Sequence, residues 1–263
     1  MGVGVGVGVD GDGDGDGSTS ILRVRVAGRP VHHALMELSP PDLANSVTSF
    51  ATLGAGFFTL LLTWLGRPQP RRWVVAYALV FITGIPTLGW HATLDGSWRW
   101  ADTGSNLLLA YGIQVAVLHD YYVEATRRRV LLASGLVNAL AVAWMGAETY
   151  LGHVPFPLRF GQHGGFNVGE LVLIADALLV TGLLFGAKER VPAHARGLLR
   201  AIFFTFLVGV ALASADGTKV DLRVFSHHAL WHIVSAFGFV LFWAFNDLCI
   251  HGVTPAGVAP PER

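Results

Sequence analysis

Residues 84–102 read GIPTLGWHATLDGSWRWAD, and this stretch decides how the rest of the chain is interpreted. An apolar segment runs up to His91, the polar residues 95–101 follow as a break, and Asp102 opens the next apolar segment. Bilayer-spanning helices rarely carry ionisable side chains, because holding one there is costly unless it is paired or bound to a ligand. A histidine and a carboxylate on the two sides of one short turn therefore indicate a functional site near one face of a membrane.

The composition is that of a membrane protein. Hydrophobic residues make up 52% of the 263 residues and charged residues only 14%, whereas a soluble domain has roughly 25% charged residues. The formal net charge is zero, so the charge balance indicates no nucleic-acid partner. The single cysteine, Cys249, excludes an intrachain disulfide.

Seven segments are long and apolar enough to be membrane spans, since a helix needs about 20 mainly apolar residues to cross the hydrocarbon core. The predicted fold is therefore all-α, a seven-transmembrane-helix bundle over residues 46–250. An extramembrane arm (21–45) precedes it and a short tail (251–263) follows it. The predicted spans are 46–66, 73–94, 102–121, 130–151, 168–187, 197–215 and 226–248.

The first 20 residues form a low-complexity tail of Val-Gly and then Asp-Gly repeats, which cannot bury enough apolar surface to fold. We expect this tail to be disordered. Its residues Asp10, Asp12 and Asp14 imitate the start of a calcium-binding loop. Position 12 of that loop would be Ile21, where a bidentate glutamate is required, so we predict no calcium site.

The distribution of basic residues predicts the orientation. The first, third and fifth connections between spans contain nine arginines and lysines, and the other three contain four. Cytoplasmic loops carry the excess of basic residues, so we expect the N-terminus outside and the C-terminus in the cytoplasm. Arg23, Arg25 and Arg29 in the N-terminal arm favour the opposite orientation weakly.

In this topology His91, Asp102, His228 and His232 all lie just beneath the outer interface. The two histidines of the seventh span are four residues apart, so they point from one face of a helix and can share one metal ion. His91 supplies a third nitrogen. Three protein ligands leave a fourth position for water, which is typical of a catalytic Zn²⁺ site. His227 points about 100° away from its neighbour and is a poor substitute.

Asp102 and Thr87 are the candidate catalytic residues. Asp102 can take a proton from a metal-bound water, and Thr87, one turn before His91, can steady a carbonyl oxygen or a water. Each residue also has a simpler interpretation. Asp102 can cap the third helix, Thr87 can bond to its own helix, and a membrane histidine can be a plain helix–helix hydrogen-bond partner.

Three blocks of the sequence resemble the alkaline ceramidase family and its bacterial ceramidase-like relatives, which belong to a superfamily of seven-helix membrane hydrolases that includes the progestin and adipoQ receptors. Residues 42–49 (DLANSVTS) look like the acidic-x-x-Asn-x-x-Ser motif before the first helix. Residues 84–91 (GIPTLGWH) look like Gly-x-x-Ser-x-x-Phe-His, with Asp102 eleven residues on. Residues 228–232 (HALWH) look like the His-x-x-x-His motif of the seventh helix.

The resemblance implies a zinc ion held by His91, His228 and His232, with Asp102 acting on the bound water. The implied reaction is hydrolysis of a membrane lipid amide such as ceramide to a fatty acid and a sphingoid base. Thr87 departs from the family's serine, and its extra methyl group narrows the pocket. The acidic calcium-binding stretch of the animal enzymes is also missing, which again argues against calcium.

Two other functions remain open at this stage. One is a non-catalytic receptor or haemolysin-like membrane protein that keeps the metal site for structure. The other is a small-solute transporter with Asp176 and Glu148 on a proton path. Asp176 lies inside the fifth span, where it can bond to a Ser or Thr of a neighbouring helix or stand behind a ligand histidine. Glu148 and Glu170 are expected at solvated helix ends or at an entrance, and His163 lies in the loop between them.

Overall fold

The computed structural model describes residues 24–26, 29–31, 40–151, 167–215 and 226–252. The chain divides into two units, Met1–Ser39 and Pro40–Arg263. In the first unit, β1 (Val24–Val26) and β2 (Arg29–Val31) form an antiparallel pair, a feature absent from the sequence-based expectation. The predicted disordered tail, its calcium-like motif and His163 lie outside the described residues.

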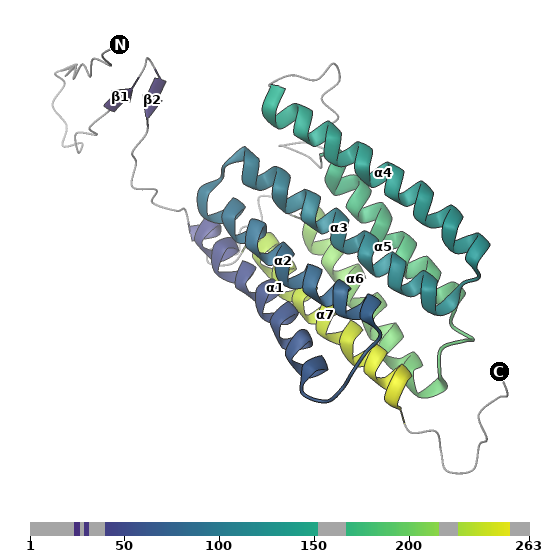
Figure 1. Ribbon diagram of the computed structural model, residues 1–263. Coiled ribbons are helices and arrows are strands. Elements are labelled where there is room, and N and C mark those ends of the chain that lie inside the picture. The colour runs from purple at the N-terminus through teal and green to yellow at the C-terminus, as the bar shows by residue number, and fades with distance from the viewer. Residues whose placement is uncertain (1–23, 27–28, 32–39, 152–166, 216–225, 253–263) are drawn as a thin grey trace, which may run out of the picture. The chain divides into compact units, whose positions relative to one another are not determined.

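The second unit is a bundle of helices (Figure 1). Seven long helices lie within its described residues, and each overlaps one predicted span. A single 3₁₀ turn, η1 (Ala193–Ala195), precedes the sixth. The helices are α1 (Pro40–Trp64), α2 (Arg71–Thr93), α3 (Gly96–Tyr121), α4 (Glu124–Leu151), α5 (Val168–Gly186), α6 (Arg196–Ala215) and α7 (His227–His251).

Six of these helices are long and apolar enough to cross a membrane, and α3 is the exception. Large apolar side chains point outward from the bundle; Phe57 of α1, Leu136 of α4 and Phe204 of α6 are each more than half exposed. Such a surface is unfavourable in water and suits a lipid environment. The structure is therefore that of a multi-pass membrane protein, as the composition indicated.

The third helix starts earlier than predicted. Residues 95–101 are not a non-helical break, because α3 begins at Gly96, capped by Asp95, whose carboxylate accepts a hydrogen bond from Ser97 N at 2.8 Å. Leu94, with φ of 53°, makes the turn from α2. The stretch was predicted to be a loop because it is polar. It is instead the start of a helix, capped by an aspartate side chain as many helices are. Asp102 lies in the second turn of α3 and is not its cap.

Helix α3 has a central place in the bundle, which explains why it is less apolar than its neighbours. It packs against α2, α4 and α5 (Figure 1). A helix surrounded by other helices exposes little surface to lipid, so it can carry polar side chains that find partners within the protein. Its fully buried apolar residues include Leu107, Leu109, Ala116, Val117 and Leu118.

Helices α1 and α2 approach each other closely at two glycines. A Cβ atom on Gly56 would lie 2.3 Å from the backbone nitrogen of Phe81, and one on Gly84 would lie 2.5 Å from Cγ of Leu53. Small residues at a crossing let two helix backbones come together. Because α1 also packs against α7, this crossing brings α1, α2 and α7 together around one site.

Candidate metal centre

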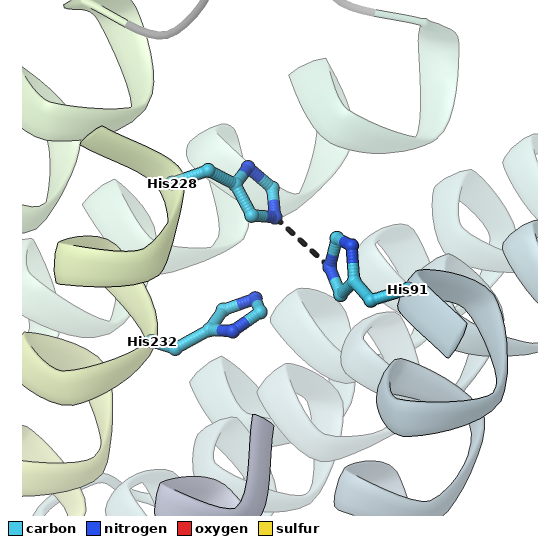
Figure 2. Close-up of side chains that lie close together, drawn as sticks. All are labelled: His91, His228 and His232. Atoms are coloured by element: carbon cyan, nitrogen blue, oxygen red, sulfur yellow. Dashed lines mark hydrogen bonds between the residues drawn. The ribbon is translucent and has the colours of Figure 1, made fainter. Parts of the chain in front are cut away.

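Three histidines from two helices converge on one point (Figure 2). His91 lies in the last turn of α2, and His228 and His232 lie in the first two turns of α7. Their candidate ligand nitrogens all lie within 4.8 Å of one another. The three pairs of ring centroids are 4.8, 4.9 and 4.8 Å apart, so the rings form a nearly equilateral triangle.

This triangle fits a small tetrahedral metal ion. With metal–nitrogen bonds of about 2.0–2.1 Å, two ligand nitrogens lie about 3.3 Å apart. The Nε2 atoms of His91 and His228 are 3.1 Å apart. His91 and His232 are buried and His228 is partly buried, so bulk water does not compete strongly for the position between the rings. The group can therefore hold a metal ion.

The simpler interpretation, a hydrogen bond between two helices, accounts for only part of this arrangement. One shared proton between His91 and His228 explains the 3.1 Å contact, but it gives no reason for a third ring at the same separation. Neighbouring His227 is not in the group, in agreement with its predicted direction.

Two hydroxyl groups of α1 hold the third histidine. Nδ1 of His232 lies 3.2 Å from Thr48 Oγ1 and 3.3 Å from Ser49 Oγ. Each hydroxyl donates its own proton to a backbone carbonyl, Thr48 to Ala44 O at 2.8 Å and Ser49 to Asn45 O at 2.7 Å. Their oxygens must then accept from Nδ1–H, which leaves the Nε2 lone pair for a metal. Such partners commonly fix the tautomer of a ligand histidine.

Sequence reasoning assigned no role to Thr48 or Ser49, although a signal was present. Asn45, Thr48, Ser49 and Thr52 recur at helical spacing in a largely apolar helix, and such a polar stripe is expected to face protein and not lipid. Asn45 Oδ1 also accepts a hydrogen bond from Ser226, the N-cap of α7. The start of α7 is thereby attached to α1 next to the histidines.

Asp102 shares its Oδ1 atom with two donors. Thr87 Oγ1 contacts this oxygen, and Asn106 Nδ2 donates to it at 3.1 Å. Thr87 also lies 2.9 Å from Thr83 O, so the predicted contact with its own helix occurs as well. The predicted capping alternative for Asp102 is wrong, because Asp95 is the cap. The structure therefore pairs the two candidate catalytic residues with each other.

Asp102 interacts electrostatically with one of the histidines and with a charged pair at the same end of the bundle. His228, Glu170 and Arg99 all act on it electrostatically. Arg99 Nη2 lies 3.4 Å from Glu170 Oε1, and its guanidinium lies 5.6 Å from the ring of Trp90. Glu170 also forms a capping box with Asn167 at the start of α5, and its side chain is 31% exposed, so it lies at a partly solvated helix end.

Two further acidic residues lie elsewhere. Asp176 is buried in α5, where its Oδ1 accepts a hydrogen bond from Gln114 Nε2 at 2.7 Å. Ser134 of the neighbouring helix α4 also interacts with this carboxyl group, as do Asn138 and Gln114, in agreement with the predicted Ser or Thr partner. These partners include no ligand histidine, so the alternative prediction, a place behind such a histidine, is wrong. Glu148 lies in the last turn of α4 and is partly exposed.

Comparisons with protein-family models, curated proteins and solved structures found no match to this chain.

Proposed function

We propose that this protein is a zinc-dependent amidohydrolase of the membrane, acting on a ceramide-like lipid. The observation that carries the proposal is the convergence of His91, His228 and His232, with ligand nitrogens within 4.8 Å, in a bundle of apolar helices. Zinc is the preferred ion because three neutral imidazoles are its usual ligands in a catalytic site.

The ligand set favours catalysis over a structural role. Structural zinc sites use four protein ligands, whereas catalytic sites use three and keep one position open. A zinc ion in such a site polarises a carbonyl oxygen and lowers the pKa of a bound water to about 7. The described residues supply three ligands. The rival function, a receptor with a structural metal, gives no reason for a carboxylate that is paired with a hydroxyl group and interacts electrostatically with His228.

The side chains of this chain supply proton transfer and orientation. Asp102 accepts the proton of the attacking water and delivers it to the leaving amine as the carbon–nitrogen bond breaks. Thr87 and Asn106 hold its Oδ1 atom, so the second carboxylate oxygen is the one that acts. Water adds to the amide carbonyl carbon, and the products are a carboxylic acid and an amine.

The substrate class follows from the setting of the site and from the three sequence blocks. The site lies at the ends of helices whose outer faces suit lipid, so a two-chain lipid amide reaches it from the bilayer. The DLANSVTS, GIPTLGWH and HALWH blocks resemble those of alkaline ceramidases, which favours ceramide as the first substrate to test. In the proposed orientation the N-terminus is outside, and the site lies near the outer leaflet.

The experiment is a paired measurement of zinc content and hydrolysis. Protein purified in lipid nanodiscs is assayed for metal by mass spectrometry and for release of fatty acid from ceramide by chromatography. We expect one zinc ion per chain and turnover that a chelator abolishes. His232→Ala should lose both, and His227→Ala, a change at the adjacent histidine outside the group, should keep both.

Asp102→Asn separates the two candidate functions. The proposed hydrolase requires that this variant keep zinc and lose activity by at least about 100-fold, the usual contribution of general acid–base catalysis. Wild-type protein that contains zinc but cleaves no lipid amide, with an Asp102→Asn variant indistinguishable from it, would support the receptor instead.

A further inference from the structure

A second buried polar cluster lies between α3, α4 and α5, away from the three histidines. Its members are Gln114 of α3, Ser134 and Asn138 of α4, and Asp176 of α5, and each is at least nine-tenths buried. Gln114 links the others, because its amide nitrogen donates to Asp176 Oδ1 at 2.7 Å and its oxygen accepts from the Ser134 hydroxyl.

This cluster contains polar atoms without partners. The second carboxylate oxygen of Asp176 is buried and makes no hydrogen bond, and neither does the amide oxygen or nitrogen of Asn138. Asn138 nevertheless lies beside the carboxyl group, together with Gln114 and Ser134. Buried polar atoms without partners are destabilising, and two of these three, Asp176 Oδ2 and Asn138 Oδ1, are acceptors, so they point to a cationic ligand that they share.

The charge of the cluster defines the ligand. The side chains that act on Asp176 are neutral, and a lone carboxylate inside a membrane bundle is unfavourable unless a positive charge accompanies it. One carboxylate balances one positive charge. The surrounding oxygens of Asn138, Gln114 and Ser134 are hard donors, which suit an alkali cation, whereas calcium usually takes six to eight oxygens, commonly including several carboxylates.

We propose that Asp176, Asn138, Gln114 and Ser134 form a binding site for one sodium ion. The ion binds Asp176 Oδ2 and Asn138 Oδ1, the two acceptor atoms that lack partners, and it thereby joins α4 to α5. It thereby stabilises the packing of the three helices and takes no part in hydrolysis. This inference does not depend on the proposed enzymatic function.

The test compares the thermal unfolding of the purified full-length protein in sodium chloride and in choline chloride at equal ionic strength. At a sodium concentration about ten times Kd, we expect the unfolding midpoint to rise by about 3–6 °C. Asp176→Asn and Asn138→Ala should each remove this rise and leave the zinc content unchanged. Asp247→Asn, which removes a carboxylate at the far end of α7 that pairs with Arg67, should keep it.

If a variant fails to fold, the proposal can still be tested by measuring the binding of radioactive sodium to the wild-type protein. We expect one ion per chain, displaced by excess unlabelled sodium and not by choline. Equal midpoints in the two salts, as expected for a protonated carboxyl group or a water-filled site, would overturn the proposal. Stabilisation by calcium alone, or a sodium effect retained in Asp176→Asn, would overturn it as well.

Discussion

Removing the two hydroxyl groups behind His232 should weaken zinc binding without touching any ligand. In the double variant Thr48→Val, Ser49→Ala, the Nδ1–H group of His232 loses both hydroxyl acceptors and keeps only the backbone carbonyl of Asn45. His232 is only 6% exposed, so water cannot readily replace them. Each lost hydrogen bond costs about 0.5–1.5 kcal/mol, so the double variant loses about 1–3 kcal/mol in all.

The lost hydrogen bonds destabilise the tautomer and ring orientation of His232 that bind the metal. Without the hydroxyl groups, the ring is free to turn or to change tautomer, and either change removes the Nε2 lone pair from the site. At about 1.4 kcal/mol per factor of ten, the expected loss of zinc affinity is about 5- to 150-fold, within the range usual for partners of ligand histidines. Each single variant keeps one of the two hydroxyl groups, so its loss of zinc affinity should be about 2- to 12-fold.

The assay is a competition titration of zinc against a chromophoric chelator, with the protein in nanodiscs. Thr59→Val is the matched control, because the Thr59 hydroxyl is equally buried in α1 but bonds only to the carbonyls of Ala55 and Gly56. Its affinity for zinc should equal that of the wild type. A double variant with unchanged zinc affinity would refute the idea that these hydroxyl groups orient the ligand.

Two further predictions concern the fold that positions the site. Gly56→Ala should lower the free energy of unfolding by about 1–3 kcal/mol, because its new Cβ atom would meet the backbone of Phe81; Gly54→Ala, with nothing within 4 Å, should show no such loss when both are measured by denaturant titration. Asp95→Ala should lower the free energy of unfolding by about 1 kcal/mol through loss of the α3 cap, measured in the same way. An equal loss in Asp102→Asn would contradict the assignment of Asp95 as the cap.

The sequence was sufficient to predict the helices that face lipid and the histidine group. Long apolar runs mark spans because lipid accepts no exposed polar backbone, and the i,i+4 spacing places His228 and His232 on one face whatever surrounds them. The directions of the second and seventh spans predicted that His91 lies at the same depth as these two histidines.

The start of α3 and the hydrogen-bond partners of the buried polar residues could not be predicted from the sequence. Residues 95–101 contain the N-cap of α3 and its first turns, and they are polar because they lie at a helix end. A prediction based on hydropathy alone therefore assigns them to a loop. The partners of Asp176 and His232 depend on which faces of α1, α3, α5 and α7 meet. Periodicity along one helix does not specify its neighbours, so Gln114, Thr48 and Ser49 required the three-dimensional structure.

X-ray absorption at the zinc edge, on purified protein with a measured metal content, tests the central claim most directly. We expect one zinc ion per chain, coordinated by three imidazole nitrogens at about 2.0–2.1 Å and by one water oxygen. The signal should be lost in His232→Ala and retained in His227→Ala. Protein that binds no zinc after reconstitution, or binds it without histidine nitrogens, would contradict the account.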